Sequence, residues 1–321
     1  MHLEFIAVII SFIITIIWGN IIIPVLMKFK FGQTIRVDGP KRHLSKKGTP
    51  TMGGVIFIPS IALASLLFTE KNPHIIVSLI SMIGFGLIGF VDDFIKIIKK
   101  RTLGLRANQK LIFQLALSFI IAVYARNFSP GTSVINAPFV AEGIDLGVLF
   151  IPFTVFIILG TVNSVNLTDG LDGLVSGITV IISFFFTLIS LSFGQQNMAI
   201  FCAAISGACL GFLIFNYYPA KVFMGDTGSL GLGGALVAIS VLTGMQIYLV
   251  FFGMIFIIET LSVILQVVFF RLTGKRIFKM SPIHHHFELS GWKEPTIVFM
   301  FWCFTILTGI LGLIAFYYTY F

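Results

Sequence analysis

Five aspartates stand at the ends of long apolar stretches in this sequence, and they are its first candidates for chemistry. Only 11% of the residues are charged, so carboxylates do not arise there by default. A charge at the centre of a bilayer costs roughly 2.5–3.5 kcal/mol, so five such groups require a membrane interface or bound cations. The five are Asp92, Asp93, Asp169, Asp172 and Asp226.

Composition indicates the kind of protein that must position these aspartates. Hydrophobic residues make up 57% of the 321 residues and include 36 phenylalanines, whereas soluble domains are roughly 45–50% apolar. A membrane-crossing helix takes about 20 residues, so the length allows about ten spans and no separate soluble domain. We therefore predict an all-α, polytopic membrane protein in which residues 1–321 form a single transmembrane helical bundle.

The apolar runs themselves predict ten transmembrane helices. They lie near residues 3–27, 51–68, 74–91, 109–125, 147–165, 174–193, 198–218, 229–244, 247–270 and 297–320. The segment 126–146 contains Pro130, Gly131 and Pro138, and we expect it to be an exterior loop.

Lysine and arginine divide the predicted loops between two faces. Of the 21 basic residues, 19 fall on one face when Lys110 is counted with it, and the other face holds only Lys71 and Arg126. The positive-inside rule places the basic face in the cytoplasm, so both termini are predicted on the extracytoplasmic side. The net charge of +8 is explained by this orientation, and nucleic acid is not expected as a partner.

The same alternation of loops places all five aspartates on the cytoplasmic face. They come from three separate connections and share that face with three basic loops. Such a mixture suits a polyanionic ligand and a divalent metal better than an ion pathway, whose charges would be spread through the membrane depth. We therefore predict an active site at the cytoplasmic face.

Asp92 and Asp93 end the third predicted span and are followed by basic residues. Adjacent residues on a helix point about 100° apart, so one carboxylate faces a given ligand while the other is free to bind a second cation. An acidic pair at a helix C-terminus also opposes the macrodipole and calls for a compensating cation. The alternative is a solvated helix end without function.

The linker at residues 166–173 reads NLTDGLDG and has no basic residue. Because Asp169 and Asp172 are three residues apart, one helical turn or a tight loop would aim both at the same ligand, and the glycines allow close backbone approach. The alternative is an ordinary turn in which Asp172 caps the next helix.

The stretch at residues 216–229 reads NYYPAKVFMGDTGS. We expect a flexible loop in which Asp226 supplies a hard anionic ligand for Mg²⁺ held together with substrate phosphates. The glycines after residue 228 equally indicate close helix packing.

Three consecutive histidines, His284 to His286, lie in the last predicted cytoplasmic loop. Adjacent histidines rarely share one metal with good geometry, so recognition of phosphate or sugar is favoured over a zinc site. Glu259 is a lone carboxyl in the middle of the ninth predicted span. We interpret it as protonated or hydrogen-bonded within the bundle and not as catalytic.

Taken in order, these motifs resemble those of a known family. The stretches are GTPTMGG at 48–54, DD at 92–93, NQK at 108–110, NLTDGLDG at 166–173, MGDTGS at 224–229 and HHHFE at 284–288. They closely resemble the phospho-N-acetylmuramoyl-pentapeptide transferase family (MraY, translocase I) within the polyprenyl-phosphate N-acetylhexosamine 1-phosphate transferase superfamily. The likeness extends over the whole chain, and the first and last stretches favour this branch over its relatives.

The resemblance implies a reaction and a location. Phospho-N-acetylmuramoyl-pentapeptide would pass from UDP-N-acetylmuramoyl-pentapeptide to undecaprenyl phosphate, giving lipid I and UMP in peptidoglycan biosynthesis with Mg²⁺ as cofactor. The protein would be a multi-pass enzyme of the bacterial cytoplasmic membrane, with the lipid bilayer as partner, and a homodimer is left open. Phosphoryl transfer of this kind depends mainly on positioning and charge neutralisation.

The motif match also implies roles for residues. Asp226 would ligate Mg²⁺, and Asp92 would deprotonate or orient the lipid phosphate with the support of Asp93. Which of that pair takes the proton, and whether an aspartate attacks to form a covalent phospho-enzyme, stays open. The implied substrate-binding residues are Lys46, Lys110, Asn166, Asp169, Asp172, Asn216, Phe223, His284, His285 and His286.

Within that set the resemblance separates two ends of the substrate. Phe223 would stack on uracil and Lys46 would donate a hydrogen bond to its carbonyl, whereas Lys110 and the histidines would hold phosphates or the sugar. Two other functions compete with this interpretation. A transferase of N-acetylglucosamine 1-phosphate would share the aspartates without the HHHFE stretch, and a secondary transporter would need a mid-membrane charge, for which Glu259 is the candidate.

Overall fold

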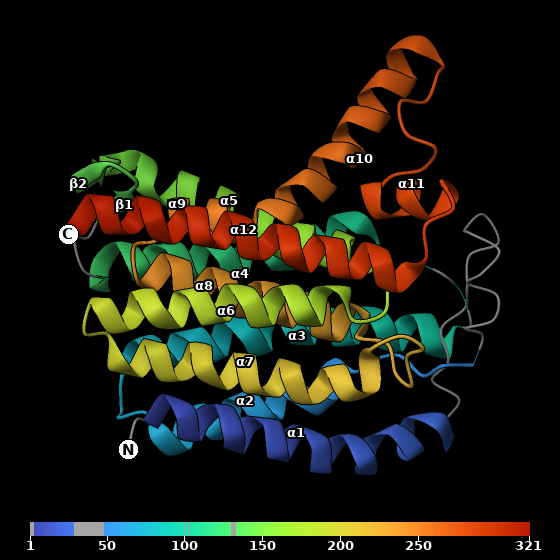
Figure 1. Cartoon of the computed structure of the whole chain (residues 1–321), viewed down its shortest axis with the longest axis horizontal. Helices are drawn as coiled ribbons and strands as arrows, with labels where there is room; N and C mark the ends of the chain where they lie inside the picture. The colour runs from blue at the N-terminus through green and yellow to red at the C-terminus, as the bar shows by residue number, and fades with distance from the viewer. Residues whose placement is uncertain (1–2, 29–47, 100, 102, 130–132) are drawn as a thin grey trace.

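The computed structural model describes residues 3–28, 48–99, 101, 103–129 and 133–321. Lys46, one of the predicted binding residues, lies outside these ranges. The described part of the chain is a bundle of long, roughly parallel and antiparallel helices with one small β-hairpin (Figure 1). The predicted all-α membrane fold is therefore confirmed, with the hairpin as an addition.

The elements have the following bounds. The helices are α1 (Leu3–Lys28), α2 (Gly54–Phe68), α3 (Pro73–Ile98), α4 (Ala107–Phe128), α5 (Phe150–Thr168), α6 (Leu174–Ser192), α7 (Gln196–Asn216), α8 (Gly225–Leu242), α9 (Gln246–Phe252), α10 (Met254–Thr273), α11 (Ile283–Leu289) and α12 (Glu294–Tyr320). The strands are β1 (Val134–Ala137) and β2 (Val140–Asp145), and a 3₁₀ turn, η2 (Gly147–Leu149), leads into α5.

Nine helices in the described ranges are long and apolar enough to cross a membrane, counting η2 with α5. The second of the ten predicted spans corresponds to α2, which has only 15 residues, whereas a straight crossing takes about 20. Nine of the predicted spans thus contain a helix long enough to cross, and the second span contains this shorter apolar helix.

The predicted exterior loop contains ordered structure. Strands β1 and β2 pair antiparallel, and Asn136 in β1 joins two other elements. Its backbone N–H donates to the Gly244 carbonyl at 2.8 Å, and its side-chain oxygen accepts from the Tyr320 hydroxyl at 2.9 Å. The hairpin therefore ties the turn after α8 to the end of α12.

The predicted ninth span, 247–270, is wrong as a single helix. It is broken at Gly253 into α9 and α10, and α10 leaves the bundle at a steep angle (Figure 1). The Gly253 N–H donates to the Leu249 carbonyl at the end of α9, and the Gly253 carbonyl accepts from Phe256 at the start of α10. The low helix propensity of glycine favours a break here, although the apolar pattern continues through it.

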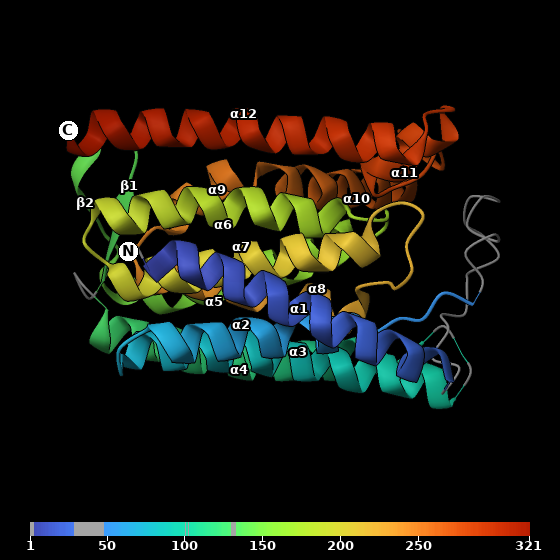
Figure 2. The ribbon, with the colours of Figure 1, turned by 60° about the horizontal axis from the view of Figure 1, so that its bottom comes forward.

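The start of α1 and the end of α12 lie at the same end of the bundle (Figures 1 and 2). Helix α11 and the connections that carry the predicted site residues lie at the opposite end. This arrangement agrees with the predicted grouping of loops. The assignment of that second end to the cytoplasm stays a prediction.

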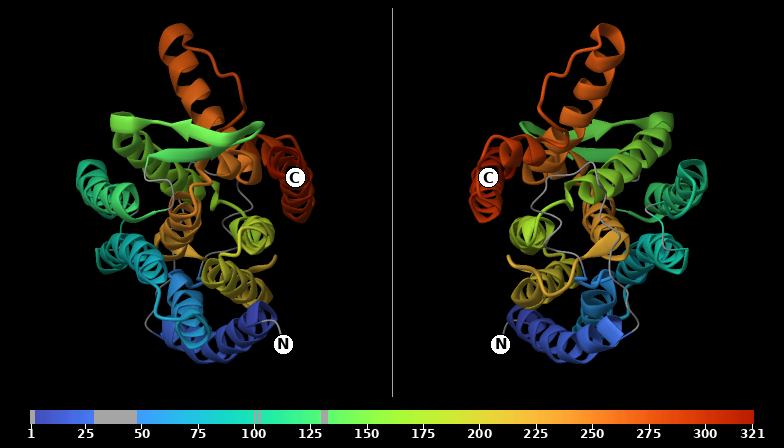
Figure 3. Two further views of the ribbon diagram at one scale, coloured as in Figure 1. Left: turned by 90° about the vertical axis from the view of Figure 1, so that its left-hand side faces the viewer. Right: turned by 90° about the vertical axis from the view of Figure 1, so that its right-hand side faces the viewer.

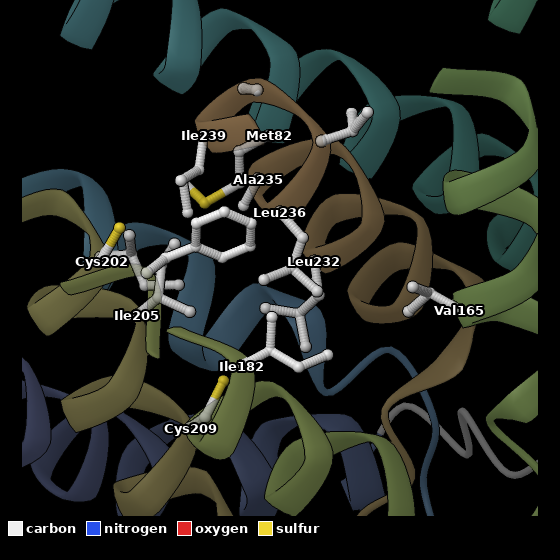
Figure 4. Close-up of a cluster of buried hydrophobic side chains, with 14 of the residues drawn as sticks. Met82, Val165, Ile182, Cys202, Ile205, Cys209, Leu232, Ala235, Leu236 and Ile239 are labelled. Carbon is white, nitrogen blue, oxygen red and sulfur yellow. The ribbon is translucent and has the colours of Figure 1, made fainter. Parts of the chain in front are cut away.

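Helix α8 is the most enclosed element of the bundle. It packs against α2, α3 and α5, and all its residues from Thr227 onward are buried. The end-on views of Figure 3 show the other helices around it. Figure 4 shows Met82 of α3, Val165 of α5 and Ile182 of α6 on different sides of α8, whose Leu232 and Leu236 are also drawn.

Glycines let the backbones of these helices touch α8. A Cβ atom added to Gly89 of α3 would lie 2.0 Å from the Asp226 carbonyl oxygen, and one added to Gly54 would lie 2.5 Å from the Gly228 nitrogen. Real Cβ contacts do not reach such distances, so only glycine fits at these two positions. The contact at Gly89 fixes the start of α8 beside α3. A Cβ atom on Gly233 would lie 2.8 Å from the Val162 Cα atom, and one on Gly234 would lie 2.8 Å from the Ser81 carbonyl oxygen, so the close-packing interpretation of the glycines after residue 228 is confirmed.

We predict that Gly89→Ala destabilises the protein because the added methyl group forces α3 away from rigid backbone of α8. Overpacking of this kind costs about 1–3 kcal/mol of unfolding free energy, measurable as a lower thermal unfolding midpoint in detergent micelles. Gly160→Ala is the matched control, because no heavy atom lies within 4 Å of its added Cβ. Equal midpoints for the two variants would show that the contact at Gly89 does not hold α3 and α8 together.

Candidate active site

Asp92 and Asp93 do not form a solvated helix end. Helix α3 continues past them to Ile98, and each of the two residues is only 3% exposed. The alternative of a solvated helix end is therefore wrong. Their burial in the last turns of α3 requires charged or hydrogen-bonding partners, since an unpaired buried carboxylate is strongly unfavourable.

Asp226 lies in the first turn of α8 and not in a flexible loop. Gly225, just before it, has a φ of +70°, a conformation that glycine adopts without strain. A Cβ atom at Gly225 would also lie 2.7 Å from both Asp93 Oδ2 and Thr51 Oγ1. The expected loop is thus a sharp turn into a buried helix, which gives Asp226 a fixed position.

The carboxylates of Asp92, Asp93 and Asp226 form one cluster. Each offers an oxygen, and these oxygens all lie within 4.8 Å of one another. The expectation that one member of the pair binds a separate cation is not supported by this geometry. Three hard, anionic oxygen donors fit a small divalent cation such as Mg²⁺, which prefers carboxylate ligands together with water and substrate phosphates.

Asp93 also caps the N-terminus of α8 from a different helix. Its carboxylate accepts hydrogen bonds from the backbone N–H of Asp226 at 3.2 Å and from that of Thr227 at 2.9 Å. It accepts a third from the Thr227 hydroxyl at 2.8 Å. A negative group at a helix N-terminus satisfies free N–H groups and interacts favourably with the helix dipole.

Two lysines offset most of the negative charge of the cluster. Lys96 Nζ lies 2.6 Å from Asp92 Oδ2 and 3.0 Å from Asp226 Oδ2, and Lys110 Nζ lies 2.9 Å from the same Asp226 oxygen. Lys110 was among the predicted residues, whereas Lys96 was not. The signal for Lys96 was its spacing, because residues three and four positions after an aspartate share its helix face.

Asn166, at the end of α5, belongs to the same site. Its amide donates to Asp226 Oδ1 at 3.0 Å and to the Ser229 hydroxyl at 2.8 Å. Asn166, which the sequence analysis names as a substrate-binding residue, therefore contacts the carboxylate cluster. Ser229 was not predicted, and its position one helical turn after Asp226 was the signal available.

Asp169 follows α5 and is partly buried beside the cluster. Desolvation raises the pKa of this carboxyl well above its usual range, and the negative charges of Asp226, Asp93 and Asp172 raise it further. The shift favours the neutral form, which donates a hydrogen bond instead of repelling an anion.

Asp172 and Asn216 are committed to internal hydrogen bonds. The Asp172 carboxylate accepts from the Ala220 backbone N–H at 3.0 Å, and its own N–H donates to Glu294 at 2.7 Å. The Asn216 side chain accepts from Gly173 and donates to the Val222 carbonyl. These two predicted binding residues hold the connection between α7 and α8 in place, and both are buried.

Phe223 lies in that connection and is half-buried. Its backbone N–H donates to the Pro50 carbonyl at 2.8 Å, and its carbonyl accepts from Gly53 at 2.9 Å. The segment before α2 is thereby fixed to the segment before α8. This contact brings the chain that follows the first predicted loop close to Asp226.

The three histidines have partners of their own. All three lie in α11, a short helix at a place where we expected a loop. His285 Nδ1 lies 2.6 Å from Glu288 Oε2, and His286 Nδ1 accepts from the Lys279 N–H. None of the hydrogen bonds described for these histidines goes to the aspartate cluster, so their predicted contact with substrate stays a prediction.

His284 is fully buried and pairs with Glu259 of α10. Its Nδ1 lies 3.0 Å from Glu259 Oε1, and both side chains have no exposed surface. The interpretation of Glu259 as hydrogen-bonded within the bundle is confirmed. A Cβ atom on Gly170 would lie 2.2 Å from His284 Nε2, so the imidazole packs directly against the linker that carries Asp169.

The fold and this charged cluster belong to a class of membrane transferases. Residues 75–244 match the glycosyl transferase family 4 pattern, and residues 46–58 match phospho-N-acetylmuramoyl-pentapeptide-transferase signature 1.

Several curated proteins resemble the chain over nearly its full length. It is 54% identical over 307 residues to the phospho-N-acetylmuramoyl-pentapeptide-transferase of Clostridioides difficile, covering 95% of each chain. The enzyme of that name from Caldanaerobacter subterraneus is 51% identical over 94% of this chain and 95% of its own. The one from Acetivibrio thermocellus is 49% identical over 96% and 93%. The chain belongs to the phospho-N-acetylmuramoyl-pentapeptide-transferase family, which confirms the predicted resemblance.

We predict that Asp93→Ala exposes the start of α8 because its first N–H groups lose their acceptor. Loss of a helix cap costs about 0.5–2 kcal/mol, and the amides of Asp226 and Thr227 should exchange faster with deuterium in hydrogen-exchange mass spectrometry. Asp92→Ala is the comparison, since the backbone N–H described as donating to Asp92 is that of Leu105 and not one of α8. Equal protection of these amides in the two variants would exclude the capping role.

We predict that Glu259→Leu destabilises the junction of α10 and α11. It leaves His284 Nδ1 buried without an acceptor, which costs about 1–3 kcal/mol, seen as a lower thermal midpoint. Glu259→Gln keeps an acceptor oxygen and should lose less. Glu142→Gln on the exposed strand β2 is the surface control, and a loss as large there as in Glu259→Leu would contradict the prediction.

Proposed function

We propose that this chain transfers phospho-N-acetylmuramoyl-pentapeptide from UDP-N-acetylmuramoyl-pentapeptide to undecaprenyl phosphate, which yields lipid I and UMP. The reaction would take place at the cytoplasmic face of the bacterial cytoplasmic membrane. The observation that carries the proposal is the cluster of three carboxylates and two lysines at one end of an apolar bundle. It combines carboxylates that suit a divalent cation with ammonium groups that suit phosphate oxygens.

In the proposed reaction a phosphate oxygen of undecaprenyl phosphate attacks the phosphorus attached to the sugar. The new P–O bond forms while the bond from that phosphorus to the bridging oxygen breaks, and UMP leaves with the bridging oxygen. Charge accumulates on phosphate oxygens throughout, so most of the acceleration comes from positioning and neutralisation. Among the described residues, Lys110 and Lys96 are the cations that contact the cluster and would supply this neutralisation.

Mg²⁺ is the metal we propose, and Asp226 is its principal ligand. The cluster fits this ion by its donor type and by the closeness of its oxygens, and Asn166 holds Asp226 Oδ1 in orientation. When bound, the ion would neutralise the diphosphate and its leaving group.

Asp92 is the residue we assign to the lipid phosphate. Asp93 accepts three hydrogen bonds from the N-terminus of α8. We therefore assign it a structural role beside Asp92. Asp92 itself is buried, but the outward face of α3 beside it is apolar, since Val91, Phe94 and Ile98 are all exposed. A lipid lying along this outward face would bring its phosphate to the end of α3 that carries the cluster, where Asp92 would orient it or take its proton.

We assign the nucleoside end of the substrate to the linker between α5 and α6 and to the connection between α7 and α8. Asp169, whose pKa is raised by desolvation and by the neighbouring carboxylates, would hydrogen-bond the nucleoside, and the half-buried Phe223 would stack on uracil. Asp172 and Asn216 support this end through the backbone. They would act by holding the connection before α8 and not by touching the nucleotide.

We predict that Asp226→Asn lowers UMP release by roughly 100–1,000-fold, the range seen when one preorganised electrostatic group is removed. EDTA should abolish the wild-type rate and excess Mg²⁺ should restore it. The measurement is UMP release by purified protein with undecaprenyl phosphate in detergent, and Asp145→Asn in the distant hairpin is the control. Full activity in EDTA would refute the metal role of Asp226.

The same assay decides the substrate. Turnover is expected with UDP-N-acetylmuramoyl-pentapeptide and not with UDP-N-acetylglucosamine. Turnover with the second substrate alone would assign the chain to the competing transferase activity. Solute uptake into vesicles that persists in Asp226→Asn would instead favour a transporter.

A further inference from the structure

Lys96 occupies the centre of the carboxylate cluster. Its Nζ lies 2.6 Å from Asp92 Oδ2, 3.0 Å from Asp226 Oδ2 and 3.8 Å from Asp93 Oδ1. The same three residues are the ones whose oxygens are close enough to share a metal ion. The ammonium group therefore uses the oxygens that a bound cation would use.

The position of Lys96 follows from the helix itself. It stands four residues after Asp92 and three after Asp93, so all three side chains share one face of α3. Asp226 is brought to that face by the contact between Gly89 and the start of α8. The spacing along α3 and the packing of α8 thus place Lys96 next to all three carboxylates.

Lys110 differs from Lys96 in this respect. Among the described ion pairs Lys110 contacts only Asp226, and it approaches from α4, outside the group. Lys96 is 27% exposed, and its flexible aliphatic stem lets the ammonium leave the cluster without movement of the helix. Lys96 is therefore the cation that must give way when a metal ion takes the three carboxylates.

We propose that Lys96 is an internal counter-ion that competes with the divalent cation, so that metal binding is coupled to the arrival of a diphosphate that accepts the displaced ammonium. This inference rests on the proposed function for the identity of the diphosphate. Lys96 would neutralise the carboxylates before substrate binds and would bind phosphate oxygens afterwards. Because such coupling is reciprocal, the diphosphate promotes metal binding and the metal promotes diphosphate binding.

The first test measures Mn²⁺ binding to the full-length protein without nucleotide, by the EPR signal of the free ion. Lys96→Met should bind Mn²⁺ about tenfold more tightly than the wild type, because close charge pairs have coupling energies of at least this size. Lys99→Met removes an exposed lysine one turn away, and its affinity should change less than about twofold, as for a solvent-screened charge. Asp226→Asn should lose the site, which identifies the ion being measured.

The second test uses two constants that should move in opposite directions. In steady-state assays, Lys96→Met should need less Mg²⁺ for half-maximal rate, whereas its KM for the UDP-linked substrate should rise about tenfold through loss of a charged hydrogen bond. A purely structural defect would not lower one constant while raising the other. Lys96→Gln is the second variant if Lys96→Met does not fold.

Equal or weaker Mn²⁺ binding by the Lys96 variants would overturn the inference. Its failure is distinguishable from failure of the proposed function. Tighter Mn²⁺ binding in Lys96→Met without UMP release by the wild type would refute the reaction and leave the competition intact. UMP release by the wild type with unchanged Mn²⁺ affinity in Lys96→Met would do the reverse.

Discussion

The close contact between α8 and its neighbours α2 and α3 is the constraint on which the site depends. Gly89 and Gly54 bring backbone against backbone at the first turn of α8. In a membrane, helices gain little from burying apolar side chains against each other, so close packing through small residues is a main source of association. Here the same packing places the N-terminus of α8 beside Asp92 and Asp93. The contact that holds the helices together therefore also assembles the carboxylate cluster.

Charge balance explains how so apolar a protein keeps these aspartates. Buried carboxylates are tolerated when cations and hydrogen-bond donors surround them. Asp226 has Lys96, Lys110 and Asn166, and Asp93 has the N-terminus of α8. The neutralising groups come from α3, α4, α5 and α8, so no single segment of the chain can form the site before the bundle has assembled.

Much of this architecture was predictable from the sequence because membranes impose simple rules. Apolar length gave the spans, and the distribution of basic residues grouped the connections that meet at one end. The break at Gly253 was not predictable in this way, since hydropathy averages over the turn and α9 and α10 are equally apolar. The continuation of α3 beyond Asp92 was missed for the related reason that charges were taken to mark the end of a span.

The division of labour among polar residues was harder still to predict. Asp172 and Asn216 look like ligands by composition, yet the structure turns both toward backbone groups of the connection before α8. The sequence shows that a buried polar side chain needs a hydrogen-bond partner. It does not show whether that partner is a substrate or another group of the protein. Lys96 shows the converse, because a residue that would be read as part of a basic loop lies at the centre of the cluster.

The histidine segment and the aspartate cluster are linked through the linker at residues 169–173. At one end of the linker, the charges of Asp226 and Asp93 raise the pKa of Asp169. Next to it, Gly170 packs against His284, whose imidazole contacts Glu259 of α10. An imidazole fixed by a carboxylate has a defined ring position, so the linker rests on a rigid support. Because α10 carries Glu259 and α11 carries His284, two helices that lie far from this linker in the sequence support the backbone beside Asp169.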